Sequence, residues 1–163
     1  MGYHGGIFCT YAGNWYKGRC IPRQHGLGIN GYKAKINEDY VSGPSTMTNE
    51  ELQSNRTDMY EDLISNKLIT DNYWQDRIPD HTKIKIPILS SANWGGQALH
   101  SRGNFEGFNK VASKEKWLEV HGLEHWTEFY TDYGIELQKR FFGYYLKYEK
   151  NGWQNQPKVS IQV

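Results

Sequence analysis

The sequence predicts an α/β fold in which part of a parallel sheet follows a segment of short helices and loops. Over residues 84–150, short apolar runs alternate with longer segments whose apolar residues repeat at helical spacing. Strand–helix–strand–helix order at this spacing is typical of a parallel sheet. Residues 1–44 are instead rich in glycine and aromatic residues, with no sustained period, which favours loops and tight turns.

The first regular element is predicted to begin at Thr48. Thr48 is followed three residues later by Glu51, which is the pattern of a capping box at a helix amino terminus. The apolar side chains beyond it recur at helical spacing, so one face of this helical region is expected to be buried. The members of this stripe are Leu52, Met59, Tyr60, Leu63 and Ile64.

The second half of the chain supplies the predicted sheet. Strands are expected at 84–89 and 116–120, and the residues between them include a helical stripe of Phe105, Phe108, Val111 and Ala112. A second helix is indicated by pairs four residues apart, such as Leu137 with Phe141, and should end at Asn151-Gly152. Residues 158–163 alternate in polarity and predict a further strand.

Charge and hydropathy exclude several classes of protein. Nineteen basic and 18 acidic residues in 163 give a net charge of +1, which does not fit a protein that coats nucleic acid. No run approaches the 18 apolar residues of a membrane-spanning helix, and the first residues do not form a secretory signal. We therefore predict a cytoplasmic protein that binds neither membrane nor nucleic acid.

Chemically useful residues follow both predicted strands, where active sites of parallel sheets lie. Asn93-Trp94-Gly95-Gly96 follows the first strand, and His121-Gly122-Leu123-Glu124-His125 follows the second. The second segment matches an inverted zinc-peptidase pattern, so a zinc peptidase using His121, Glu124 and His125 is one alternative. That chemistry needs both imidazoles on one helical face. Gly122 weakens a helix and no third ligand is evident, so we predict neither metal nor cofactor.

A set of ordered landmarks resembles the carboxyl-terminal part of the CocE/NonD hydrolases. These are serine hydrolases of the α/β-hydrolase fold, related to Xaa-Pro dipeptidyl-peptidases and cocaine esterase. The landmarks are Ile86-Pro87-Ile88-Leu89, Trp94-Gly95-Gly96, Arg102-Gly103-Asn104-Phe105-Glu106-Gly107-Phe108, Lys116-Trp117-Leu118-Glu119-Val120-His121-Gly122, Arg140-Phe141-Phe142, Tyr145-Leu146-Lys147 and Asn151-Gly152-Trp153. The resemblance is clear over 81–163 and looser over 1–80.

The resemblance implies a division of the chain into three parts. Residues 1–80 would be a cap and connecting segment, and 81–150 the final strand–helix units of the hydrolase sheet. Residues 151–163 would begin a truncated carboxyl-terminal jelly-roll domain. In the family the serine nucleophile precedes the cap, so the resemblance implies a fragment of an enzyme that cleaves small ester, amide or Xaa-Pro peptide substrates. The isolated chain would then be inactive, with the amino-terminal half of the same enzyme or another copy as its partner.

The resemblance also assigns roles at the site. The family's catalytic histidine falls on His125, whereas His121 would be structural. The family's aspartate, which orients that histidine, is replaced here by Gly96. Asn93 is the candidate that takes over this role, with Glu106 as another option, because a triad histidine needs an acceptor on its second nitrogen.

Two aromatic residues of the cap segment are candidates for the substrate-binding wall. Trp15 and Trp74 would line an acyl or peptide pocket. A rival interpretation of the whole chain is a non-catalytic remnant or subunit that only binds a partner.

Overall fold

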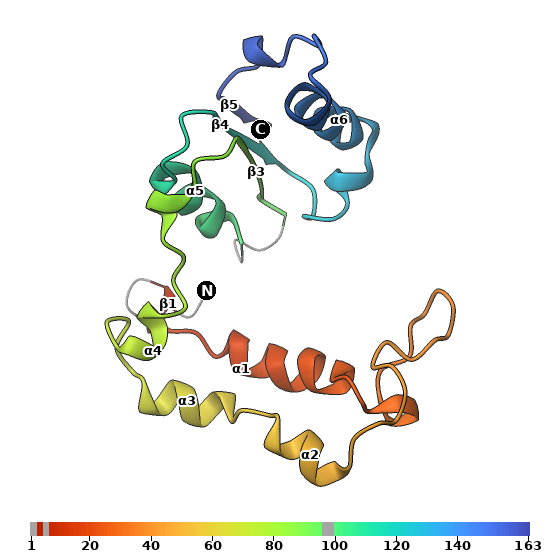
Figure 1. Ribbon diagram of the computed structural model, residues 1–163. Coiled ribbons are helices and arrows are strands. Elements are labelled where there is room, and N and C mark those ends of the chain that lie inside the picture. The colour runs from red at the N-terminus through yellow and green to blue at the C-terminus, as the bar shows by residue number, and fades with distance from the viewer. Residues whose placement is uncertain (1–2, 5–6, 96–99) are drawn as a thin grey trace. The chain divides into compact units, whose positions relative to one another are not determined.

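The computed structural model describes residues 3–4, 7–95 and 100–163 of the chain (Figure 1). Contacts divide the chain into two compact units, Met1–Ile78 and Pro79–Val163. The predicted assignment of 1–80 to a cap and of 81–150 to a hydrolase sheet stays a prediction. No helix among the described residues combines the length and apolar character needed to cross a membrane.

The amino-terminal unit is built from short helices and turns. A two-stranded antiparallel ribbon opens it, formed by β1 (Tyr3–His4) and β2 (Ile7–Phe8). The α-helices are α1 (Tyr11–Trp15), α2 (Asn49–Ser54), α3 (Met59–Ser65) and α4 (Asn72–Gln75). A π-helical turn spans Tyr16–Cys20, and 3-10 turns span Ile21–Arg23 and Gly28–Asn30.

The predicted capping box at the start of α2 is confirmed. The side chain of Thr48 accepts a hydrogen bond from the backbone N–H of Glu51 at 3.2 Å, and the Glu51 carboxylate accepts one from the backbone N–H of Thr48 at 2.7 Å. The first turn of α2 is thereby satisfied from both sides. Its inward residue Leu52 is buried, as Leu63 is on α3.

The carboxyl-terminal unit contains a three-stranded parallel sheet in the order β3–β4–β5, which confirms the α/β class (Figure 1). The elements are β3 (Ile88–Asn93), α5 (Ser101–Lys110), β4 (Lys116–His121), α6 (Asp132–Lys147) and β5 (Val159–Ile161). A 3-10 turn at His81–Lys83 precedes β3, a second at Glu128–Tyr130 lies between β4 and α6, and a third at Trp153–Asn155 lies between α6 and β5.

One helix covers each face of the sheet (Figure 1). Side chains alternate between the two faces along a strand. On one face Ala92, Leu118 and Val120 pack against the α5 residues Phe105 and Phe108. On the other face Trp117 packs with two α6 residues and one from the turn after it, namely Leu137, Phe141 and Trp153.

Several element boundaries differ from the prediction, each for a local reason. The first strand begins at Ile88 instead of residue 84, directly after Pro87, which has no N–H to give to the ladder. The helix α5 ends at Lys110, so Val111 lies beyond it in extended backbone. The helix α6 ends before Tyr148, which takes the left-handed conformation at φ 58°, whereas Asn151-Gly152 was expected to end it.

The predicted last strand forms as β5, and it joins the main sheet. Leu118 on β4 pairs with Val159, and Val120 pairs with Ile161, in parallel. The assignment of 151–163 to the start of a jelly-roll domain stays a prediction.

Candidate functional site

The face of the sheet beneath α6 changes from apolar to polar toward the carboxyl ends of its strands. Leu89 and Trp117 are register partners and belong to the core under α6. Two residues later Ser91 pairs in register with Glu119, and after two more Asn93 pairs with His121. Because residues two apart share a face, these four polar side chains gather at one end of the sheet.

A buried carboxylate–imidazole pair lies at the centre of this group. Oε2 of Glu119 is 2.9 Å from Nδ1 of His121, and Glu119 and His121 are only 3% and 2% exposed. The Ser91 hydroxyl donates to the same carboxylate oxygen at 2.5 Å. The Gln162 amide donates to the other oxygen at 3.3 Å. Donors from three neighbouring segments thus satisfy a carboxylate that would otherwise be costly to bury.

The pair determines which nitrogen of His121 is available. Since Nδ1 faces a carboxylate, it is the ring nitrogen that donates a hydrogen bond to Glu119. Nε2 is fully buried and has no hydrogen-bond partner among the described residues. The side-chain nitrogen of Asn93 is also buried without a hydrogen-bond partner among the described residues, and Asn93 as a whole is 2% exposed.

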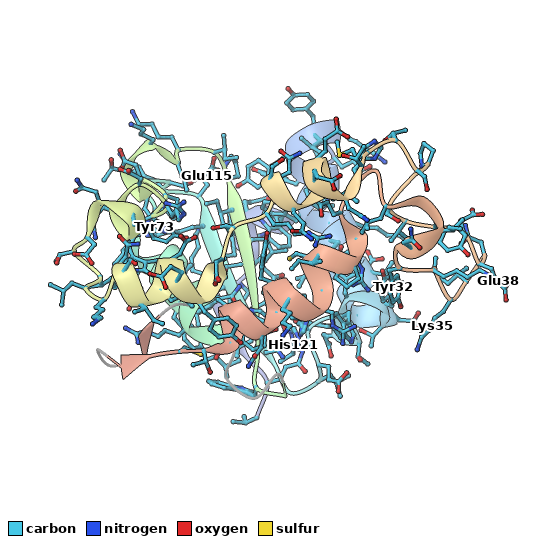
Figure 2. The ribbon with its side chains drawn as sticks, turned by 90° about the horizontal axis from the view of Figure 1, so that it is seen from below. Tyr32, Lys35, Glu38, Tyr73, Glu115 and His121 are labelled. Atoms are coloured by element: carbon cyan, nitrogen blue, oxygen red, sulfur yellow. The ribbon has the colours of Figure 1, made fainter. Side chains whose placement is uncertain are left out.

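A cavity of about 300 Å³ lies between this end of the sheet and α6; His121, which lines it, is labelled in Figure 2. Ser91, Glu119 and His121 form its sheet side. Its other side is largely aromatic and aliphatic. Those residues are Phe129, Leu137, Phe141 and Phe142, and polar groups are added by His125, Glu128, Tyr133 and Gln138.

The electrostatic character of the cavity is negative. Glu119 and Glu128 both line it, and both are largely buried. Burial raises the pKa of the Tyr133 hydroxyl, and the carboxylates of Glu119 and Glu128 raise it further. The cavity therefore disfavours an added negative charge.

The predicted catalytic residue His125 lies in the loop after β4 and is exposed. It also lines the cavity, so the structure brings His121 and His125 to the same space. Its ring lies 4.0 Å from that of Trp126 and 5.1 Å from that of His100, measured between ring centres. No hydrogen bond joins His125 to another of the described residues.

The described residues that were predicted to orient His125 have other contacts. Asn93 faces His121 in register instead. Glu106 forms an ion pair with Lys110 on α5 at 2.7 Å, and this hydrogen bond lowers the pKa of the Glu106 carboxyl. Gly96 lies outside the described residues. The assignment of Asn93 as the orienting residue stays a prediction.

The two predicted substrate-wall residues belong to the amino-terminal unit. Trp15 is 45% exposed on α1, with its ring 5.6 Å from that of Tyr11. Trp74 is half-buried on α4, and its indole N–H donates to the backbone oxygen of Asn66 at 2.6 Å. Their role in a substrate pocket stays a prediction.

The zinc-peptidase pattern does not form the helix that its chemistry needs. His121 ends β4, whereas Glu124 and His125 lie in the following loop. Nδ1 of His121 is already engaged by Glu119. Within the described ranges, no group of three or more His, Cys, Asp or Glu side chains is placed to hold a metal ion.

Sequence reasoning missed two features of the site. It assigned His121 a structural role but did not identify Glu119 as its partner. The two residues are separated by one position and therefore share a face of β4. It also did not associate His100 with His125. The signal was the position of His100 just beyond β3, at the same end of the sheet as the loop after β4.

Comparisons with known proteins place this geometry in context. No protein-family model and no curated protein matches the chain. Two crystal structures of a CocE/NonD family hydrolase from Staphylococcus aureus are similar to it, with 40% and 42% sequence identity and TM-scores of 0.63 and 0.62. The matches cover 70% and 66% of this chain but only 21% and 19% of the hydrolase. The chain therefore corresponds to about a fifth of the length of that enzyme, and over this segment its predicted resemblance to the CocE/NonD hydrolases is confirmed.

Proposed function

We propose that the chain provides the histidine-bearing segment of a hydrolase that cleaves ester or amide bonds by acyl transfer. The observation that carries this proposal is the 40% identity to a CocE/NonD family hydrolase. The position of His125 supports it, because this residue lies beyond the carboxyl end of a parallel strand and lines a cavity. Small esters and amides, including Xaa-Pro peptides, are the proposed substrates.

In this proposal His125 moves the proton. A serine hydroxyl supplied from outside the chain attacks the carbonyl carbon while His125 accepts its proton. His125 then returns that proton to the leaving alcohol or amine, and water repeats the cycle on the acyl-enzyme. The ring of His125 is exposed and therefore accessible to a nucleophile, and it lies beside the rings of Trp126 and His100.

The amino-terminal half of the same enzyme is the proposed partner. Among the described residues, no strand pairs with the outer edge of β3. An open edge and a sheet of only three strands favour the addition of another strand. The cytoplasmic location expected from the sequence stays a prediction.

A chimaera tests the proposed function. The segment of the S. aureus hydrolase that matches this chain is replaced by residues 1–163, and hydrolysis of an activated acetate ester is measured beside the isolated chain. We expect turnover by the chimaera and only the rate of free imidazole from the isolated chain. A folded but inactive chimaera would instead support the non-catalytic interpretation.

A mixing experiment tests the partner. The S. aureus hydrolase lacking its matching segment is combined with this chain, and the masses present are measured by sedimentation. A 1:1 complex is expected. A dimer of this chain that excludes the added protein would show that a second copy occupies the edge.

A further inference from the structure

We propose that the cavity beneath α6 binds a small organic ammonium ion of the size of benzylammonium, whose nitrogen is held by the carboxylate of Glu128. This inference does not depend on the hydrolase proposal, because such a site needs neither a nucleophile nor turnover. It rests on a largely buried acidic side chain without a partner in the described structure, on the charges around the cavity and on its aromatic walls.

The requirement for a cation comes from Glu128. This residue is 7% exposed and lines the cavity. Within the described ranges its hydrogen bonds are made by the backbone N–H and carbonyl oxygen, and its carboxylate forms neither a hydrogen bond nor an ion pair. A carboxylate that is largely removed from water without a partner is costly. A cation that binds beside Glu128 would offset this cost.

The carboxylate of Glu128 is also accessible. Its oxygens are absent from the side-chain atoms that are shut off from solvent without a partner. Since they have no partner in the described structure, they keep contact with solvent. The Glu128 carboxylate also raises the pKa of the Tyr133 hydroxyl, which indicates that the two groups lie close together. Tyr133 is exposed and lines the same cavity, so a ligand that enters beside Tyr133 approaches Glu128.

The other charged groups of the cavity do not neutralise Glu128. Neither lysine nor arginine is among the described residues that line it. Glu119 adds a second carboxylate, and Nδ1 of His121 is directed at Glu119. His125 also lines the cavity but donates no hydrogen bond to Glu128. These charges favour a cationic ligand over an anionic one.

The walls determine which kind of cation fits. A calcium or magnesium ion needs about six oxygen ligands, and both oxygens of the Glu119 carboxylate already accept hydrogen bonds. The cavity instead offers the aromatic rings of Phe129, Phe141 and Phe142, and aromatic rings attract organic cations. Its volume of about 300 Å³ accommodates a single substituted ring. An aromatic ammonium ion therefore matches both the charge and the walls.

A ligand series on the unmodified chain tests the proposal. Benzylammonium, benzyl alcohol and benzoate are titrated separately at neutral pH, while NMR follows the ring protons of Tyr133. Benzylammonium should saturate and shift these signals. Benzyl alcohol, which has a similar shape but no charge, should bind about tenfold more weakly, because a hydrogen bond to a charged group is the stronger one. Benzoate should not saturate.

Two variants locate the ammonium group. Glu128→Gln keeps the size of the side chain and removes its charge, so it should weaken benzylammonium about tenfold while benzyl alcohol is unchanged. Glu136→Gln is the matched control, because it removes the same charge from an exposed position on α6 that does not line this cavity, and it should leave the affinity nearly unchanged. If Glu128→Gln does not fold, the ligand series on the unmodified chain still decides.

Four results would overturn the proposal. Equal affinity for benzylammonium and benzyl alcohol would show that the charge is not recognised. An equal loss of affinity in Glu128→Gln and Glu136→Gln would show that only the net charge of the chain matters. Saturation by benzylammonium without a shift of the Tyr133 signals would place the ligand elsewhere. No saturation by benzylammonium would show that the cavity holds no such ligand.

Discussion

Oε2 of Glu119 lies 2.9 Å from Nδ1 of His121, and the two side chains are almost completely buried at the end of β4. The contact connects the packed centre of the sheet to the loop that carries His125. Because Ser91 and Gln162 donate to the same carboxylate, residues from β3, from β4 and from beyond β5 meet at one carboxyl group. We expect this group to stabilise the sheet and to hold the site in place.

Removal of the Glu119 carboxylate should therefore destabilise the chain strongly. Glu119→Ala leaves the donors of His121 and Ser91 without an acceptor, and each buried donor costs about 1–3 kcal/mol. Glu106→Ala is the control, since its ion pair with Lys110 is exposed and screened by solvent and should contribute little. Urea unfolding measures the free energy of unfolding of both variants. An equal loss of stability in the two would contradict a special role for Glu119.

The chain should lose stability at alkaline pH as the hydroxyl of Tyr145 ionises. This hydroxyl donates a hydrogen bond to the carboxylate of Glu115, which is labelled in Figure 2, at 2.9 Å. Burial raises the pKa of Tyr145, and the hydrogen bond raises it further. Since the folded pKa lies above the unfolded value, this contribution is complete below about pH 10 and is lost as the pH rises further.

Tyr145→Phe is the variant that tests this pH dependence. It should be less stable than the unmodified chain at pH 8 and should lose less stability between pH 8 and pH 11. Tyr148→Phe, at a position that is 87% exposed, is the control. Urea unfolding at each pH gives the comparison, and identical pH profiles for the two variants would refute the role of Tyr145.

The capping box of α2 should make a measurable contribution to the amino-terminal unit. Thr48→Ala removes the acceptor of the Glu51 backbone N–H and should cost about 1 kcal/mol. Thr48→Ser keeps a hydroxyl and should restore most of that loss. The stability of the unmodified chain and of the two variants is measured by circular dichroism during thermal unfolding. Equal stability of Thr48→Ala and the unmodified chain would count against the capping role.

Two glycines on the covering helices should respond to alanine in opposite directions. A Cβ at Gly134 would lie 2.1 Å from the backbone oxygen of Glu128, so Gly134→Ala should displace the turn that lines the cavity and cost about 1–3 kcal/mol. A Cβ at Gly107 meets nothing within 4 Å, so Gly107→Ala should stabilise α5 by about 0.5–1 kcal/mol. Chemical denaturation measures the free energy of unfolding of both variants. A change of the same sign in both would contradict the tight packing at Gly134.

The sequence was a good guide where local chemistry determines structure. The capping box at Thr48 is set by residues three apart, and the strand at 116–120 by the three large apolar residues among its five, so both were predictable. The end of α6 was not, because Tyr148 takes a left-handed conformation that a sequence pattern assigns to Gly152. The pairing of β5 with β4 depends on contacts between residues about 40 positions apart, which periodicity does not reveal.

The candidate site was predictable in its location only. Both polar segments follow strands, and parallel strands bring their carboxyl ends together. The partnership of Glu119 with Ser91 needs the register of two strands, and the proximity of His100 to His125 needs the path of two loops. Neither is encoded in the spacing of residues along the chain.

The central claim is that His125 is the proton-transferring residue of a hydrolase, and the turnover number of the chimaera tests it most directly. His125→Ala should lower kcat for an activated ester by about three orders of magnitude or more, as removal of a triad member does. His81→Ala, at a half-buried histidine outside the cavity, should change kcat less than about tenfold. Full turnover by a folded His125→Ala chimaera would contradict the claim.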